Sequence, residues 1–271
     1  MKKTRTLRIA ALTLSACLIA LSAAGCTSAS EGKLEKIRDK GEMVVYMDAN
    51  FAPFEFQGPN GVQGVDVEIA RAIAAELGVK ATFVEADFDS ILMAIKGGKG
   101  DVAISGFTIT EERKESVDFS APYIESVQYL ILMEASEIAV MEDLAGRKVG
   151  VAKDYTGQFL MEDEMGEEGV LHGKGVELRE YNSAMEAALD LNIGRIDAVV
   201  MDEYVAKNVV SKNPGMKAVE LKYSDGGIAS EEYGVAVPKN NEDLLEIINK
   251  VITELVRDGK IEGWVVEYGN K

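Results

Sequence analysis

The amino-acid sequence predicts an α/β protein made of two similar lobes, each with a parallel sheet and helices on both faces. Short apolar runs alternate with amphipathic helical segments along the chain after residue 26. Residues 98–104 (GKGDVAI) and 194–200 (GRIDAVV) repeat one pattern, in which a glycine and a basic residue lead into an aspartate and an apolar strand. The ~245 residues after the first 26 are enough for one large or two small domains.

The first lobe is predicted to alternate three strands with two helices. The strands are expected at residues 43–47, 81–84 and 101–104. Asp66 is the expected N-cap of the first helix, whose apolar residues recur every four positions up to Gly78. Asp89 is the expected N-cap of the second helix, which ends at Gly97 and Gly98. This strand-helix-strand order predicts a parallel sheet.

The second lobe is predicted to repeat this order, and a separate C-terminal part follows it. The strands of the second lobe are expected at residues 148–152 and 197–201, and the C-terminal part opens with a strand at 233–237. Ser183 and Glu186 form a capping box at the start of a helix in the second lobe. The C-terminal part is dominated by a long amphipathic helix that begins at Asn240 or Asn241 and ends at Gly259.

The N-terminal residues have the pattern of an export signal. Four basic residues precede an apolar run at 9–20 that is too short for a convincing membrane span. Cys26 follows Ala-Ala-Gly and resembles the acylated cysteine of bacterial lipoproteins; Cys17 is a rival match, and plain secretion is the alternative. We therefore predict a signal peptide at 1–25 and a lipid-anchored tether at 26–32.

Composition excludes several classes of site and partner. The two cysteines, Cys17 and Cys26, leave the mature chain without a disulfide, a thiolate metal site or a cysteine nucleophile. The single histidine, His172, stands in a polar stretch and is expected to be solvated. After residue 26 there are 25 basic and 46 acidic residues, which argues against nucleic acid. We expect a monomer with no metal and no cofactor.

Polar and aromatic residues follow the predicted strands at their carboxyl ends, where ligands of open α/β sheets bind. These residues are Asp48, Phe51, Phe88, Ser105, Gly106, Phe107, Thr108, Arg113, Tyr155, Thr156 and Asp202. The planar fork of Arg113 matches a carboxylate, and Asp202 has the right charge for an ammonium group. Together these two residues describe an α-amino acid. Two alternatives stay open, because Arg113 could be a surface residue and Asp202 a helix N-cap.

The chain resembles the polar amino-acid family of bacterial ABC-importer solute-binding proteins, family 3, from about residue 33 to 269. The resemblance is carried by four motifs at family spacing: residues 48–56 (DANFAPFEF), 64–69 (GVDVEI), 101–123 (DVAISGFTITEERKESVDFSAPY) and 233–239 (YGVAVPK). It implies two Rossmann-like lobes of the type II periplasmic-binding-protein fold. Two hinge strands, near 123–127 and 229–233, would join lobe 1 (33–124 and 232–271) to lobe 2 (125–231), with the ligand in the cleft between the lobes.

The resemblance also implies roles for the candidate residues. The carboxylate of the ligand would be held by Arg113, Thr108 and the backbone of Gly106 and Thr156. Its ammonium group would be held by Asp202 and the backbone of Gly106. The side chain would lie against Phe51 and Phe88 with Asp48 at its far end, and Ser105, Phe107 and Tyr155 complete the predicted lining.

This chain departs from the family where the second-lobe turn often reads Gly-Thr-Thr-Gly, because Asp154 and Tyr155 stand there. The expected function is capture of a polar L-amino acid by hinge closure and delivery to the permease subunits of an ABC importer. Arginine or lysine is the expected ligand, then glutamine, because Asp48 can pair with a cation that stacks on phenylalanine rings. The alternative is an extracytoplasmic cyclohexadienyl (arogenate or prephenate) dehydratase, with Asp48, Glu125 or Asp154 as proton donor.

Overall fold

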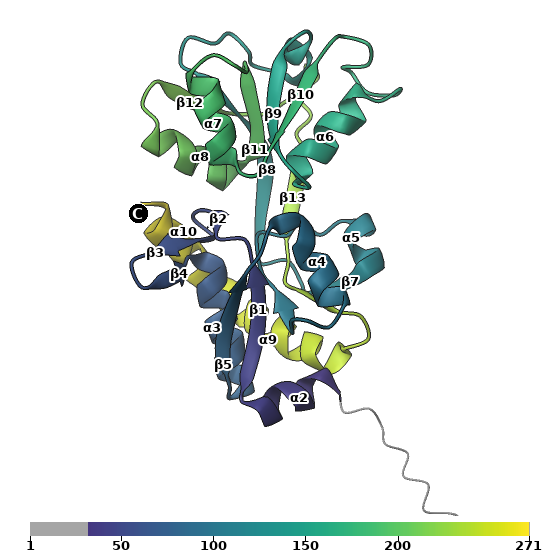
Figure 1. Ribbon diagram of the computed structural model, residues 1–271, viewed down its shortest axis with the longest axis vertical. Coiled ribbons are helices and arrows are strands. Elements are labelled where there is room, and N and C mark those ends of the chain that lie inside the picture. The colour runs from purple at the N-terminus through teal and green to yellow at the C-terminus, as the bar shows by residue number, and fades with distance from the viewer. Residues whose placement is uncertain (1–31, 271) are drawn as a thin grey trace, which may run out of the picture. The chain divides into compact units, whose positions relative to one another are not determined.

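The computed structural model describes residues 32–270 (Figure 1). The predicted signal peptide, Cys17, Cys26 and all of the predicted tether except its last residue lie outside these residues. No helix in the described part of the chain is both long enough and apolar enough to cross a membrane.

The first large sheet has the strand order β5-β1-β6-β14-β7. Its strands are β1 (Glu42–Met47), β5 (Lys80–Glu85), β6 (Val102–Ala103), β7 (Val117–Phe119) and β14 (Ala236–Pro238). The first three are parallel, as predicted, and β14 inserts antiparallel between β6 and β7. The accompanying helices are α2 (Lys33–Lys40), α3 (Val65–Leu77), α4 (Phe88–Lys96), α5 (Glu111–Ser116), α9 (Glu242–Arg257) and α10 (Lys260–Gly269). A small sheet joins β2 (Asn50–Phe51), β3 (Glu55–Gly58) and β4 (Gly61–Gln63).

The second large sheet has the order β10-β9-β11-β8-β12. Its strands are β8 (Ile124–Met133), β9 (Lys148–Ala152), β10 (Glu177–Tyr181), β11 (Ala198–Asp202) and β12 (Met216–Glu220). Its helices are α6 (Thr156–Met165), α7 (Ala184–Asn192), α8 (Glu203–Lys212) and the short 3₁₀ helix η1 (Met141–Leu144). Here β9, β10 and β11 are parallel, while β8 and β12 run antiparallel to their neighbours.

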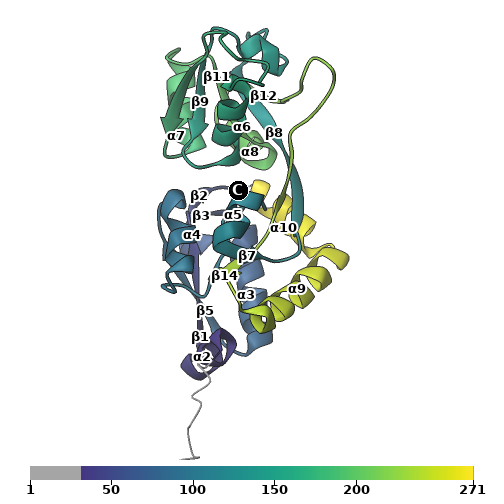
Figure 2. The same cartoon turned by 90° about the vertical axis from the view of Figure 1, so that its right-hand side faces the viewer.

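Two strands connect the two sheets, as the resemblance implied (Figure 2). The ten-residue strand β8 pairs with β13 (Ser230–Tyr233) in its first half and with β11 and β12 in its second. The pairing of β8 with β13 is antiparallel and sets Glu231 opposite Ser126. The predicted two-lobed α/β fold is therefore confirmed.

The repeated sequence pattern has a structural reason. Asp101 directly precedes β6. Its Oδ2 accepts a 2.7 Å hydrogen bond from the backbone N–H of Val44, which lies on the neighbouring strand β1. Asp197 accepts a 2.8 Å bond in the same way from the N–H of Lys148 at the start of β9. In each lobe this aspartate ties the residue just before one strand to the backbone of the parallel neighbouring strand. The two lobes therefore share a local device as well as an element order.

Two predicted helix caps are wrong. Helix α3 follows Gly64, and Asp66 lies inside its first turn with its side chain completely buried. Helix α4 follows Asp87, so Asp89 also lies one residue inside its helix. An aspartate just before an apolar stripe is a good local signal for an N-cap, but both carboxylates have distant partners instead. Ser183 does cap α7, where its hydroxyl accepts a bond from the N–H of Glu186.

Candidate functional site

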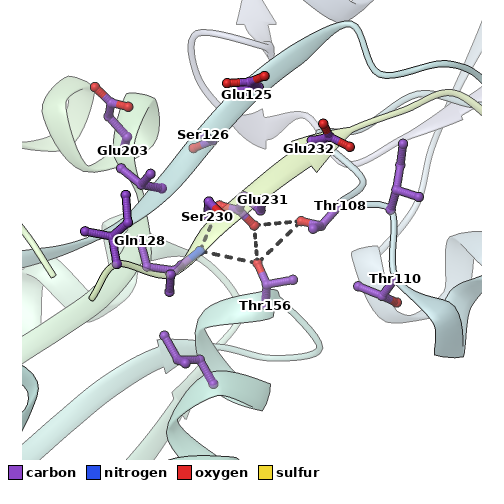
Figure 3. A pocket seen from close by; sticks show the side chains of 15 residues that line it. Thr108, Thr110, Glu125, Ser126, Gln128, Thr156, Glu203, Ser230, Glu231 and Glu232 are labelled. Carbon is purple, nitrogen blue, oxygen red and sulfur yellow. Dashed lines mark hydrogen bonds between the residues drawn. The ribbon is translucent and has the colours of Figure 1, made fainter. Parts of the chain in front are cut away.

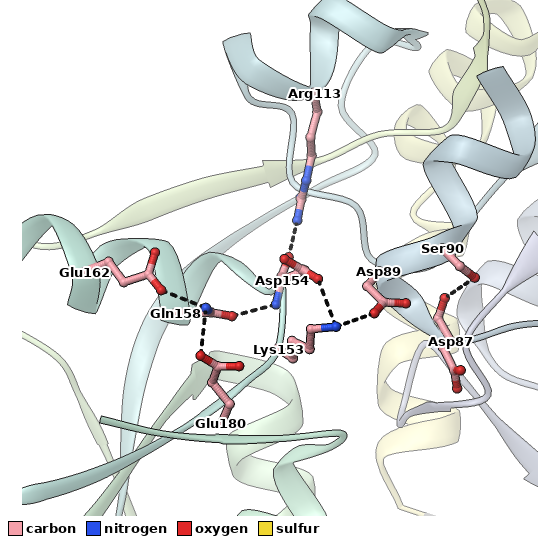
Figure 4. Close-up of polar contacts among 9 residues, drawn as sticks. All are labelled: Asp87, Asp89, Ser90, Arg113, Lys153, Asp154, Gln158, Glu162 and Glu180. Atoms are coloured by element: carbon pink, nitrogen blue, oxygen red, sulfur yellow. Dashed lines mark hydrogen bonds and ion pairs between the residues drawn. The ribbon is translucent and has the colours of Figure 1, made fainter. Parts of the chain in front are cut away.

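The side chain of Arg113 lies at the meeting of the two lobes and is buried. It is 9% exposed, and its Nη1 donates to the carbonyl of Thr108 at 2.9 Å while Nη2 donates to the carbonyl of Asp154 at 3.0 Å (Figure 4). Its guanidinium also lies 5.5 Å from the ring centre of Phe88 and 5.6 Å from that of Phe107. Burial lowers the pKa of Arg113, but a guanidinium stays charged in proteins. Arg113 is therefore not a surface residue.

Asp154 acts through its backbone. Its carbonyl accepts the bond from Arg113, and its N–H donates to Gln158 at 2.7 Å. Its φ of 61° lies in the left-handed region, where glycine is favoured. The departure from the family turn therefore keeps the glycine-like backbone and adds an exposed carboxylate 4.0 Å from the ammonium group of Lys153.

The ring of Tyr155 contacts both phenylalanines that were expected to hold the ligand side chain. It stacks on Phe88 with ring centres 4.0 Å apart and lies 5.5 Å from the ring centre of Phe51. Its hydroxyl donates to Oδ2 of Asp48 at 3.2 Å. Phe107 stacks on Phe88 with ring centres 4.6 Å apart. Tyr155 thus occupies the place that the resemblance assigns to a ligand side chain.

The far end of this aromatic group opens into a small acidic cavity. The cavity measures about 200 Å³ and is lined by Asp48, Asn50, Asp87, Phe88, Asp89, Lys153 and Asn182. Its one ammonium group, on Lys153, is paired with Asp89 at 2.6 Å. Burial raises the pKa of Asp48, and hydrogen bonds from Asn50 and Tyr155 oppose that rise. The three aspartates make this end of the site attractive to a cation.

Ser105 and Gly106 face the interior of the first lobe. The hydroxyl of Ser105 donates to Glu55 at 2.6 Å and accepts from the N–H of Asp48 at 2.9 Å. The N–H of Gly106 donates to Asp66 at 2.8 Å, which leaves only its carbonyl for a ligand. Burial raises the pKa of Asp66 to about 6.

Gly106 is required by close packing. Its φ is 54°, and a Cβ there would lie 2.2 Å from the ring of Phe51. The resemblance assigns the backbone of Gly106 to the ligand. Instead, the glycine lets Phe51 approach the backbone.

Asp202 belongs to a buried polar cluster at the two connecting strands, and Figure 3 shows the cluster members Thr108, Gln128, Thr156 and Glu231. It is 2% exposed, its Oδ1 accepts from Nε2 of Gln128 at 2.6 Å, and its Oδ2 accepts from the hydroxyl of Tyr233. Asp202 holds the N-cap position of α8, but its side chain makes no capping bond. Burial raises the pKa of Asp202, while the hydrogen bonds from Tyr233 and Gln128 and the charge of Arg113 oppose that rise.

Three residues of this cluster were not found from the sequence: Gln128, Glu231 and Tyr233. The hydroxyls of Thr108 and Thr156 each donate to Oε2 of Glu231 at 2.7 Å. Since a hydroxyl has one hydrogen, neither threonine has a second to offer a ligand carboxylate in this arrangement. The alternation along residues 230–233 places Glu231 and Tyr233 on one buried face, which was the available signal.

Metal chemistry finds no support in the described residues. Between residues 32 and 270 no group of three or more His, Cys, Asp or Glu side chains could hold a metal ion.

The model of the bacterial extracellular solute-binding proteins, family 3, matches residues 43–271. The L-cystine-binding protein TcyJ of Escherichia coli K12 is 33% identical over 237 residues, which cover 86% of this chain and 85% of that one. The L-arginine-binding protein of Pseudomonas aeruginosa is 34% identical over 219 residues, covering 79% and 82%. An ancestral arginine-binding protein bound to arginine has a TM-score of 0.75 at 40% identity, covering 84% and 98%. The chain therefore belongs to the bacterial extracellular solute-binding proteins, family 3, a family of binding proteins rather than enzymes.

Proposed function

We propose that the protein binds a cationic L-amino acid, arginine or lysine before glutamine, for an ABC importer. At the coarser level it is an amino-acid-binding substrate-binding protein of that transporter class, as its family and relatives indicate. The observation that carries the finer proposal is the acidic cavity beside Asp48, reached along the rings of Phe51 and Phe88. A guanidinium or ammonium group can stack on such rings and pair with the carboxylates beyond them.

The other end of the site suits the main-chain groups of an amino acid. Arg113 now bonds two neutral carbonyls. A carboxylate in their place would accept two charge-assisted bonds, which are roughly twice as strong as bonds between neutral groups. Asp202 is buried with a raised pKa, so an ammonium group would stabilise its charge.

The ligand side chain would take the place of the Tyr155 ring. In the structure Tyr155 contacts Phe51, Phe88 and Asp48, which are the groups proposed for a guanidinium. Binding therefore exchanges a neutral phenol for a cation beside Asp48. This exchange favours arginine and lysine over an apolar amino acid.

Delivery would depend on closure of the two lobes about β8 and β13. We propose the lobe boundaries given above, with Arg113 in the first lobe and Asp202 in the second, so that a ligand contacting both shifts the protein towards the closed form. We also propose lipidation at Cys26, attachment to the outer face of the membrane through that lipid alone, a monomeric state and contact with permease subunits.

Isothermal titration of protein that has been unfolded, washed and refolded tests the ligand. The panel contains the twenty amino acids and L-cystine, since a cystine-binding relative matches most of the chain. Tightest binding of arginine or lysine supports the proposal. Tightest binding of an aliphatic or acidic amino acid, or of cystine, would refute the cationic ligand and leave the family unchanged.

A further inference from the structure

Glu231 holds together both lobes and both connecting strands. It lies on β13 and is 8% exposed. Its Oε2 accepts from Thr108 in the first lobe and Thr156 in the second, and its Oε1 accepts from Nε2 of Gln128 on β8 at 2.9 Å. A change in the charge of Glu231 would therefore act on residues of both lobes and on the connecting strand β8.

A second buried carboxylate, that of Asp202, shares the same amide nitrogen. Nε2 of Gln128 lies 2.6 Å from Asp202, 2.9 Å from Glu231 and 3.3 Å from the hydroxyl of Thr156. An amide nitrogen has two hydrogens, so it cannot serve all three acceptors. The Oε1 atom of Gln128 is buried without a hydrogen-bond partner. The cluster therefore has more acceptors than hydrogens, and a carboxyl proton would relieve that shortage.

The charged groups around the cluster also favour a proton on one of the two carboxyl groups. Arg113 on α5 is the cation whose charge acts on both carboxylates, and it already bonds two carbonyls. The other titratable groups facing Glu231 are acids or phenols: Asp202 on β11, Tyr233 on its own strand, and Glu125, Glu203 and Glu232 around the adjoining pocket. Two buried carboxylates that share one hydrogen-bond donor cannot both ionise without a large cost in free energy. Burial and then the charge of Asp202 raise the pKa of Glu231 to about 8.

We propose that Glu231 is a positioning residue of the amino-acid site, which holds a proton beside Asp202 and releases it when the ammonium group of the ligand binds Asp202. This inference rests on the proposed function, but it needs only the α-ammonium group that every amino acid carries. The ammonium brings three N–H donors and a positive charge, so both carboxylates can then be ionised. The proton passes from the Glu231 carboxyl to buffer through a pocket of about 840 Å³ that Glu231, Gln128 and Thr156 line.

The test is titration of refolded protein with L-arginine at pH 7 in buffers of different ionisation enthalpy, which counts protons released. The wild-type protein should release close to one proton, because a group with a pKa of about 8 is mostly protonated there. Release on binding means that affinity rises with pH, by about 10-fold per unit between pH 6 and 7. Glu231→Gln should bind arginine with no proton release and a flat profile.

The variant is chosen to keep the fold. A glutamine oxygen in the place of Oε1 can accept from Nε2 of Gln128, and its amide nitrogen in the place of Oε2 can donate to the hydroxyls of Thr108 and Thr156, which accept as well as donate. Glu232→Gln is the matched control, because Glu232 is the neighbouring residue with the same charge and is exposed. It should release the same proton as the wild-type protein.

The inference is overturned if the wild-type protein binds arginine without releasing a proton, or if Glu231→Gln releases as many as wild type. The second result would assign the proton to another group of the cluster, such as Asp202. If arginine gives no heat but another amino acid does, only the cationic ligand is refuted, and the same count on that amino acid decides the inference. If no amino acid binds, the proposed function and this inference both fail.

Discussion

Replacing Tyr155 by alanine tests whether this ring and the ligand compete for one place. If they compete, every contact that the ring makes in the site must be broken before a ligand side chain can enter. Removing the ring should then strengthen binding of arginine and, by the same contacts, weaken the ligand-free fold.

The size of the effect follows from three contacts. The ring packs against Phe88 and Phe51, and aromatic pairs of this kind contribute about 0.5–1.5 kcal/mol each. Its hydroxyl bonds Asp48, which adds about 1 kcal/mol. The total of about 2–4 kcal/mol corresponds to a gain in arginine affinity of about 30- to 700-fold, since 1.4 kcal/mol is tenfold. Tyr155→Phe removes only the hydroxyl and should gain about fivefold.

Titration calorimetry with arginine measures the gain, and urea unfolding without ligand measures the loss of stability. Competition requires the two free energies to have opposite signs and similar size, because one set of contacts causes both. If Tyr155→Ala weakens arginine binding, Tyr155 is a wall of the ligand pocket and the competition is refuted. If stability falls while affinity does not change, the ring is only a packing residue.

Three further substitutions have expected outcomes that follow from the structure. Arg113→Ala should weaken arginine binding by about 10² to 10³-fold or more, because losing one partner of a buried charge pair costs about 3–5 kcal/mol. The control Lys114→Ala, on the same helix, should change arginine affinity little in the same titration. Asp48→Asn should weaken arginine about tenfold or more and leave glutamine nearly unchanged, as a competition titration would show. For Glu231 the folded pKa is raised, so its contribution to stability is complete below about pH 4.3 and is lost as pH rises towards 8. In urea unfolding without ligand, the stability of wild type should therefore fall over this range by at most about 1.4 kcal/mol per pH unit. The stability of Glu231→Gln should not show this fall.

The fold could be predicted because its signals are local. Apolar runs of strand length and stripes of helical period lie within single elements, and the repeated aspartates at 101 and 197 mark the same join in each lobe. The insertion of β14 between β6 and β7 could not be read in this way, because it brings residues 236–238 beside residues far earlier in the chain. The resemblance, not the pattern, indicated that the first lobe is discontinuous.

The polar part of the site was harder to predict for a related reason. A buried aspartate with a distant partner has the same local sequence as a helix cap, so Asp66 was assigned to the wrong partner. Glu231 had no motif at all, because its partners Thr108 and Gln128 stand 123 and 103 positions away. Arg113 was predicted as a ligand residue because its planar fork matches a carboxylate and because it stands within a family motif. A glutamate in a strand that reads SEEY carries no such signal.

The structure gives each proposed ligand-binding group a partner from the protein itself. The carbonyl of Asp154 meets Arg113, the phenol of Tyr155 meets Asp48, and a shortage of hydrogens marks Asp202 and its neighbours. Binding is then an exchange of partners, and the measured affinity is the difference between two sets of contacts. The exchange favours a ligand most where it replaces a neutral partner by a charged one. Under the proposed function, an α-amino acid does so at Arg113 and Asp202 whatever its side chain, and only a cationic side chain does so again at Asp48. We therefore infer that affinity for amino acids in general and selectivity among them reside at opposite ends of one site.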